Sequence, residues 1–175
     1  MPKLIKLTAD GAVLADDRFT HVTDDEGAPE GDIIISLKRF QAEGESLRSN
    51  SREVGVRIEP DEEVEVLADE LALIPVVAVA YPKYRDGRAY TTATLLRERF
   101  GYKGEVRAVG DVLREQAGFM VRCGFDAFEP ADGSTPEQWA QAIHRHRHVY
   151  QRAADHRSPA YEERAGVVEG KTNAI

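Results

Sequence analysis

Five short apolar runs recur along the chain at intervals of roughly 20 to 30 residues, and a helical pattern of apolar positions follows each of them. The runs lie at residues 33–35, 54–58, 76–79, 105–109 and 125–128. The third run reads Val-Val-Ala-Val, and such β-branched and small side chains without alternation are typical of a strand buried on both faces of a parallel sheet. The pattern therefore predicts five strand–helix units.

Two further apolar segments, 4–7 and 12–14, flank the sequence Thr8-Ala9-Asp10-Gly11. Asp-Gly between two apolar runs is a strong signal for a β-hairpin. We therefore expect a β-ribbon near the start of the chain. Residues 24–31 are polar and contain two glycines, which predicts a linker between the ribbon and the strand–helix units.

The chain has 175 residues, which suits one domain, because a domain of about 150 residues already buries roughly 70% of its unfolded surface. We expect one α/β domain over residues 1–151, with the ribbon and linker as residues 1–31. Helical periodicity is lost beyond this domain, so residues 152–175 are predicted to form a flexible carboxyl-terminal arm.

The expected fold class is α/β: an open, mostly parallel five-stranded sheet with helices on both faces, plus the amino-terminal β-ribbon. Five units fall short of a closed eight-stranded barrel, which usually needs about 250 residues. The alternative is a half-barrel-like curved sheet that completes itself by forming a homodimer.

Capping patterns predict where two of the helices begin and end. Asp111 follows a strand and a glycine, as an N-cap does, and Gly124 suits a left-handed stop for the same helix. Thr135-Pro136-Glu137-Gln138 combines an N-cap, a proline at the first helical position and a capping-box glutamine. Helical spacing then extends this helix to Tyr150, with His146 on its apolar stripe.

Charge limits the classes of partner. Acidic residues outnumber basic ones, 31 against 23, and the formal net charge is -8. This balance argues against nucleic acid or an anionic membrane as the main partner, although it allows a local basic site. No apolar run approaches the ~20 residues needed to span a bilayer, and the first residues lack the apolar core of a signal peptide. We therefore expect a cytoplasmic protein.

Cys123 is the only cysteine, which excludes an internal disulfide, a Cys-x-x-Cys redox pair and an all-thiolate metal site within one chain. No Gly-x-Gly-x-x-Gly follows a strand, so we expect no cofactor. His144 and His148 have the i, i+4 spacing of metal ligands, but no acidic residue or cysteine stands near them in the sequence. We favour a solvated pair with His146 facing the core, and expect no metal.

The most polar connection follows the third strand, where residues 81–91 read Tyr-Pro-Lys-Tyr-Arg-Asp-Gly-Arg-Ala-Tyr-Thr. Open α/β sheets bind ligands at the carboxyl ends of their strands, and the connection after the fourth strand reaches the same rim. The candidate anion-binding or ligand-binding residues of the two connections are Lys83, Arg85, Asp86, Gly87, Arg88, Tyr90, Asp111 and Arg114.

Two interpretations of this loop are open. Lys83, Arg85 and Arg88 can supply charge-assisted donors to sulfite, sulfate or phosphate, while the loop glycine and the helix start add backbone N–H groups. Alternatively, Arg85 and Arg88 pair with Asp86, Asp111 or Asp126 and only pin neighbouring loops. Asp111 is more often an N-cap than an acid or base.

Three segments resemble the signature blocks of an uncharacterised bacterial family, the domain of unknown function number 934. They are residues 81–99, 107–114 (Arg-Ala-Val-Gly-Asp-Val-Leu-Arg) and 122–128 (Arg-Cys-Gly-Phe-Asp-Ala-Phe). The resemblance covers the carboxyl-terminal two-thirds of the chain. It implies an association with sulfite reductase and sulfate assimilation, under the label of an oxidoreductase of sulfite reduction, and it implies no catalytic residues.

The leading expectation is an accessory protein of assimilatory sulfite reduction, because the chain has no motif for an electron carrier. It would offer an oxyanion-binding or partner-docking surface at the strand ends, with sulfite reductase as a partner. A second hypothesis is a small enzyme for a phosphorylated or sulfated metabolite, with Lys83 or Asp86 as proton carrier and the two loop arginines as an anion clamp. A third is a purely structural subunit.

Overall fold

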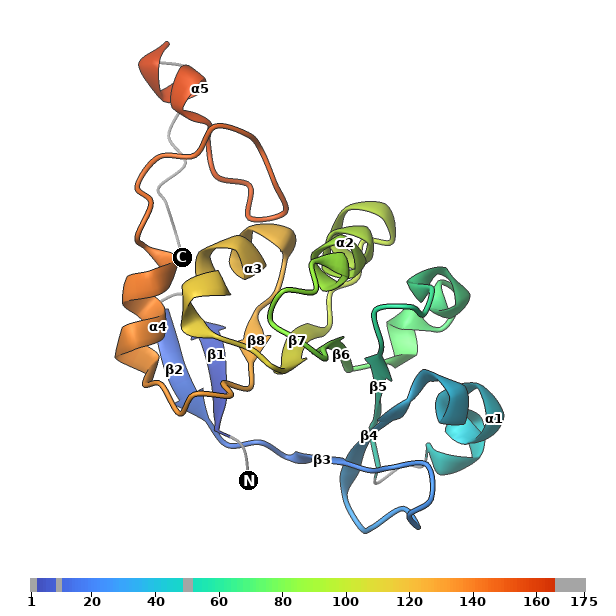
Figure 1. Ribbon diagram of the computed structural model, residues 1–175. Coiled ribbons are helices and arrows are strands. Elements are labelled where there is room, and N and C mark those ends of the chain that lie inside the picture. The colour runs from blue at the N-terminus through green and yellow to red at the C-terminus, as the bar shows by residue number, and fades with distance from the viewer. Residues whose placement is uncertain (1–2, 9–10, 49–51, 166–175) are drawn as a thin grey trace.

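The computed structural model describes residues 3–8, 11–48 and 52–165, and these residues build one eight-stranded sheet (Figure 1). The strand order is β2-β1-β8-β7-β6-β5-β4-β3. Strands β3 to β8 run parallel, whereas β1 is antiparallel to both β2 and β8. The strands are β1 Leu4–Thr8, β2 Gly11–Ala15, β3 Phe19–His21, β4 Asp32–Ser36, β5 Val54–Ile58, β6 Val76–Tyr81, β7 Glu105–Gly110 and β8 Ala127–Phe128.

The five apolar runs all form parallel strands, as predicted, and the expected ribbon is the β1–β2 pair. Thr8 pairs with Gly11, and residues 9–10 of the predicted turn lie outside the described residues. β3 was not predicted, because this strand has only three residues and its middle one is the exposed Thr20.

The helices lie on one face of the sheet, so the expectation of helices on both faces is wrong. Parallel strands in sequence order are joined by right-handed crossovers that place every helix on the same side, whereas helices on both faces require a reversal of strand order. Figure 1 shows these helices side by side along the outside of the sheet. They are α1 Leu37–Leu47, α2 Arg88–Thr94, α3 Ala117–Cys123 and α4 Pro136–Ile143, with short 3-10 helices η1 Val64–Leu67 and η2 Leu71–Leu73 between β5 and β6 and η4 Arg114–Gln116 before α3.

The sheet curls into a half-barrel, which confirms the curved sheet of the alternative expectation, while its completion by a homodimer stays a prediction. The edge strands β2 and β3 stand at opposite ends of the strand order, yet only residues 16–18 join them. Four residue steps span at most about 14 Å, so the sheet must bend until its two edges approach each other. Figure 1 shows this connector running from the ribbon to β3. On the concave face of the curled sheet Ala78, Ala80 and Arg107 are buried, whereas Arg57 is partly exposed.

Side chains alternate between the two faces of the curled sheet. Val77 and Val79 pack toward the helices in the main core, while Ala78 and Ala80 lie on the concave face. Phe19 of β3 joins them there and is 5% exposed. Small residues suit this face, because a tightly curved sheet leaves little room on its inner side.

A cluster of charges lies on the concave face around Arg107 of β7, which is 0% exposed. Its guanidinium donates to Asp17 of the connector at 2.8 and 3.2 Å, to Glu105 at 2.7 Å and to Glu129 at 3.0 Å. Glu129 also lies 2.9 Å from Nε2 of His21 on β3. We call these five residues the interior cluster. It ties the connector and β3 to the strands across the half-barrel.

The predicted helix ends are partly confirmed. Gly124 ends α3 with φ of 102°, and Thr135 caps α4 in a capping box with Gln138. Asp111 is not an N-cap, because two extended residues and η4 intervene before α3. Helix α4 ends at Ile143 rather than at Tyr150, and His146 is exposed instead of facing the core.

The predicted arm begins in an irregular segment after α4 and includes a short helix, α5 Ala160–Arg164, that buries none of its residues. Figure 1 shows α5 standing away from the sheet. Arg122 of α3 anchors the segment through Asp155 at 3.1 Å and the carbonyl of Gln151. Residues 166–175 of the predicted arm lie outside the described residues. Within the described ranges, no helix has the length and apolarity to cross a membrane.

Candidate functional site

The connection between β6 and α2 begins at the carboxyl end of the sheet's most deeply buried strand, where all six residues of β6 are buried. Residues 82–87 leave the sheet here, and Gly110 of β7 pairs with Tyr81 beside them. Gly110 has φ of 97°, and a Cβ there would meet the Tyr81 carbonyl at 2.5 Å, so only glycine fits. The loops after β6 and β7 therefore share one rim, as predicted.

Tyr84 is held at both of its backbone groups by the neighbouring loop. Its N–H donates to Oδ2 of Asp111 at 2.9 Å, and its carbonyl accepts from Nε2 of Gln116 at 2.7 Å. The backbone N–H of Asp111 donates to the Tyr81 carbonyl at 2.7 Å, which fixes the carboxylate in turn. Asp111 thus orients the neighbouring loop, and sequence reasoning missed the matching role of Gln116.

Arg88 does not serve a free anion site, because Asp86 in the same loop occupies it. The guanidinium donates to both carboxylate oxygens of Asp86, at 3.0 and 2.6 Å. Hydrogen bonds from the side chain and backbone of Arg88 hold the pKa of Asp86 below its usual range. The pinning interpretation therefore describes this pair, and Gly87 lies between the two partners as the exposed residue before α2.

Lys83, Tyr84 and Arg85 form the exposed end of this loop, and we call them the tip. Tyr84 is 42% exposed. Arg85 donates from Nε to the Tyr84 hydroxyl at 2.8 Å, and its guanidinium carbon lies 5.4 Å from the centre of the tyrosine ring. Among the described residues neither Lys83 nor Arg85 forms an ion pair. The tip therefore presents two cations and an aromatic ring to solvent.

Tyr90 belongs to the packing below the loop rather than to the tip. It is half-buried in α2, and its ring meets that of Tyr81 edge-on at a centroid distance of 5.7 Å. Tyr81 is fully buried, and burial raises the pKa of its hydroxyl far above the usual value. Within the described residues the Tyr81 hydroxyl makes no hydrogen bond. These two rings support the loop from inside.

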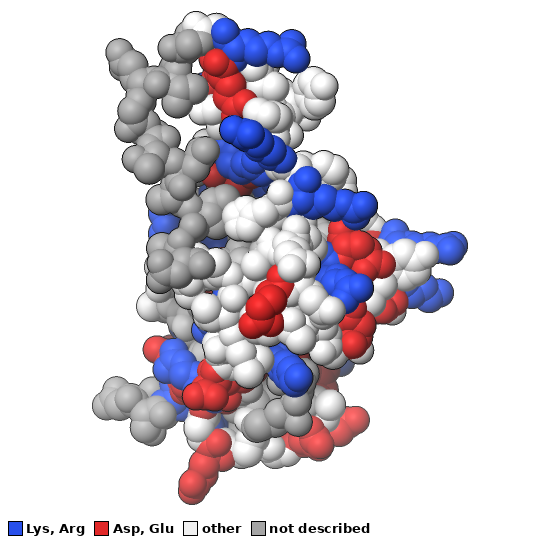
Figure 2. Space-filling view, turned by 90° about the vertical axis from the view of Figure 1, so that its left-hand side faces the viewer, with Lys and Arg blue, Asp and Glu red and all other residues white. Residues whose placement is uncertain are grey.

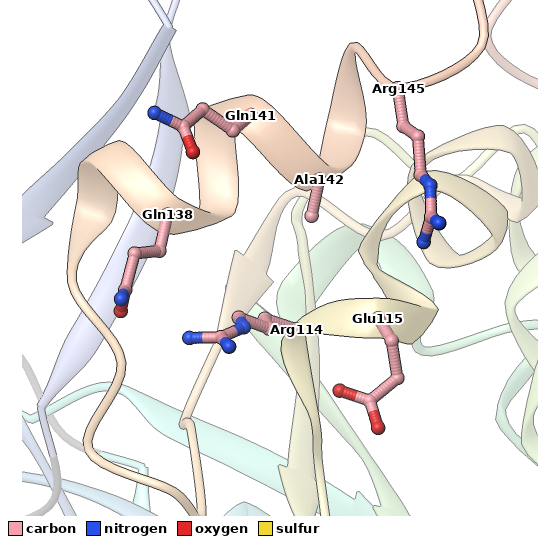
Figure 3. Close-up of a pocket in the computed structure, with 6 residues that line it drawn as sticks. All are labelled: Arg114, Glu115, Gln138, Gln141, Ala142 and Arg145. Atoms are coloured by element: carbon pink, nitrogen blue, oxygen red, sulfur yellow. The ribbon is translucent and has the colours of Figure 1, made fainter.

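Arg114 faces a separate feature on the other side of η4. A cavity of about 430 Å³ lies between η4 and α4, lined by Arg114, Glu115, Gln138, Gln141, Ala142 and Arg145 (Figure 3). Sequence reasoning missed the contribution of Arg145, because the predicted helix ran past this residue. Gln138 was recognised only as a capping residue. Of the predicted site residues, Lys83 and Arg85 thus lie in the tip and Arg114 lines this cavity, whereas Asp86, Gly87, Arg88, Tyr90 and Asp111 belong to neither.

The face shown in Figure 2 carries Lys and Arg intermingled with Asp and Glu, so no field of one sign covers it. Of the three histidines considered as metal ligands, His148 contacts Glu163 of α5 at 2.6 Å. The described ranges contain no group of three or more His, Cys, Asp or Glu residues that could hold a metal ion. Cys123 is half-buried at the end of α3, where burial raises the pKa of its thiol.

The family described as a bacterial protein of unknown function (DUF934) matches residues 55–161, and the chain therefore belongs to this family. The match begins in β5 and runs to α5, so it includes the tip, the cavity and four of the six parallel strands. No curated protein matches the chain.

Proposed function

We propose that this protein is an accessory protein of assimilatory sulfite reduction that docks a partner protein through the tip, Lys83, Tyr84 and Arg85. The observation that carries the proposal is the fixed backbone of Tyr84, held by Asp111 and Gln116 while the side chains above it stay exposed. A rigid backbone lowers the ordering cost of binding. Tyrosine and arginine are also the residues that most often dominate binding energy at protein interfaces.

The exposure of the tip favours a protein partner over a small oxyanion. Lys83, Tyr84 and Arg85 all protrude into solvent, whereas small-ligand sites are concave and bury most of the ligand. Two cations without carboxylate partners fit a partner surface that carries Asp or Glu side chains. The resemblance to a family associated with sulfite reductase supports that enzyme as the partner.

The enzymatic alternative has less support. Asp86 is a poor proton carrier, because hydrogen bonds from Arg88 hold the pKa of its carboxyl group below the usual range. Arg88 is likewise occupied, so the loop lacks the second arginine of an anion clamp. The docking function uses only the side chains that these contacts leave available.

The test is the affinity of the protein for purified sulfite reductase, measured by isothermal titration calorimetry with wild type, Arg85→Ala and Arg99→Ala. Arg99 is a matched control, because its guanidinium carbon also lies 5.4 Å from an aromatic ring, that of Phe100, and its side chain is 62% exposed. We expect Arg85→Ala to weaken binding about tenfold or more, and Arg99→Ala less than about twofold.

Three results would count against the proposal. Absence of binding by the wild type would remove sulfite reductase as the partner. Equal affinity of wild type and Arg85→Ala would remove the tip as the docking surface. Equal loss in Arg85→Ala and Arg99→Ala would indicate a general charge effect, which raising the salt concentration would reproduce.

A further inference from the structure

The cavity between η4 and α4 is built from elements whose positions are fixed by hydrogen bonds. Gln116, the last residue of η4, donates to the Tyr84 carbonyl, which holds the turn that carries Arg114 and Glu115. The capping box of Thr135 fixes the start of α4. Figure 3 shows Arg114 extending from η4 and Arg145 from the segment directly after α4. At about 430 Å³ its volume lies in the range of small-molecule sites.

Most of the polar groups around the cavity are donors. Oε1 of Gln138 accepts the N–H of Thr135 at 3.0 Å. The atom facing that N–H must be the amide oxygen, so the Gln138 NH₂ group is left to donate to a ligand. Arg114 and Arg145 add two guanidinium groups, which donate and never accept. Glu115 is the single carboxylate of the lining.

The charges around the cavity are not paired with one another. Among the described residues, none of Arg114, Glu115 and Arg145 forms an ion pair within 4 Å, and the lining carries two positive charges against one negative. Asp132, the nearby carboxylate on which the Arg114 charge acts, accepts the N–H and hydroxyl of Ser134. Two guanidinium groups beside one cavity favour an anion.

We propose that this cavity binds a small organic molecule that carries an oxyanion group, with Arg114 and Arg145 as its anion ligands and Gln138 as a further donor. The volume leaves room for an organic part beside the phosphate, sulfate or carboxylate group of the ligand. This site shares no residue with the tip, and the proposal does not rest on docking of sulfite reductase.

The test uses sodium phosphate, sodium sulfate, sodium acetate and glycerol 3-phosphate as probes, with sodium chloride at equal ionic strength as the reference. Thermal unfolding and the side-chain NH₂ signals of Gln138 in ¹⁵N-resolved NMR spectra report binding. We expect at least one oxyanion to shift both readouts, with glycerol 3-phosphate binding more tightly than inorganic phosphate. Arg114→Ala and Arg145→Ala should each weaken that binding at least about tenfold.

Arg147→Ala is the matched control, because this exposed arginine lies two residues from Arg145 and does not line the cavity. Its affinity for each probe should equal that of the wild type. The proposal would be overturned if every oxyanion shifted the melting temperature and the Gln138 signals only as far as chloride does. It would also be overturned if Arg147→Ala and Arg145→Ala lost the same oxyanion affinity. Loss of oxyanion binding in Arg85→Ala, with Arg114→Ala unaffected, would also overturn it and would place the anion at the tip.

Discussion

The interior cluster and the tip both gather charged side chains near β6 and β7. They differ in how these charges are compensated. Arg107 is fully buried and donates to three carboxylates. Lys83 and Arg85 lie in solvent, and within the described residues neither forms an ion pair. The cluster connects segments 90 residues apart, whereas the contacts of Arg85 stay within its own loop.

This difference separates charges that hold the fold from charges that remain available for a partner. A buried arginine is tolerated only when its hydrogen-bonding capacity is met, and removal of Arg107 leaves the carboxylates around it without their cation. An exposed arginine is solvated with or without its neighbour, so its loss costs the fold little. Arg88 shows the intermediate case, because it is exposed and still pairs with Asp86.

The largest effect is expected from Arg107→Ala. The substitution leaves Asp17, Glu105 and Glu129 without their shared cation, and breaking such a buried network costs about 3–5 kcal/mol of unfolding free energy. Urea unfolding at pH 7 measures the loss. Arg57→Ala is the control, because Arg57 lies in the same row of the sheet, with Ala78 between them, but its side chain is 43% exposed. Equal losses of unfolding free energy in Arg107→Ala and Arg57→Ala would contradict the distinction between buried charges that hold the fold and exposed charges that do not.

A smaller, pH-dependent effect is expected from Glu129→Gln. Burial opposes ionisation of Glu129, but contacts with His21 and Arg107 outweigh it and hold its pKa below the usual value. The folded state then binds fewer protons than the unfolded state, so the contribution of this carboxylate is present above about pH 4.3 and is lost as the pH falls below it. At pH 6 the variant should be less stable by about 1.5–3 kcal/mol.

Unfolding at pH 6 and at pH 3.5 decides this prediction, because the difference between wild type and Glu129→Gln should shrink at the lower pH. Asp17 and Glu105 also face Arg107, and both proteins contain them, so their contributions largely cancel in the comparison. A difference that stays constant or grows on acidification would show that ionised Glu129 does not stabilise the fold.

Much of the fold was predictable from local pattern. Strands β4 to β8 are apolar runs, the β1–β2 hairpin follows from its turn sequence, and the capping box of Thr135 marks the start of α4. The curl of the sheet was predicted only as an alternative, because it depends on the three-residue connector between strands far apart in the sheet. Nothing in the sequence around residues 16–18 shows that Asp17 reaches Arg107, 90 positions later.

The location of the candidate site at the strand ends was predictable, but the contacts between its side chains were not. The rule that strand ends share a rim brought Lys83 and Asp111 together correctly. It could not show that Arg88 is occupied by Asp86 or that Gln116 fixes Tyr84, because both depend on side-chain directions in irregular loops. Arg145 escaped notice because helical spacing continued past the true end of α4 at Ile143.

The smallest effect on the unfolding free energy is expected from Arg85→Ala. This variant also tests most directly whether the tip charges are available to a partner rather than needed by the fold. Urea unfolding of wild type, Arg85→Ala and Arg99→Ala at pH 7 compares two exposed arginines that stack on aromatic rings. If the tip charges take no part in holding the fold, both variants unfold within about 0.5 kcal/mol of wild type. A loss above about 1.5 kcal/mol in Arg85→Ala alone would make the tip a structural element and contradict its proposed role as a docking surface.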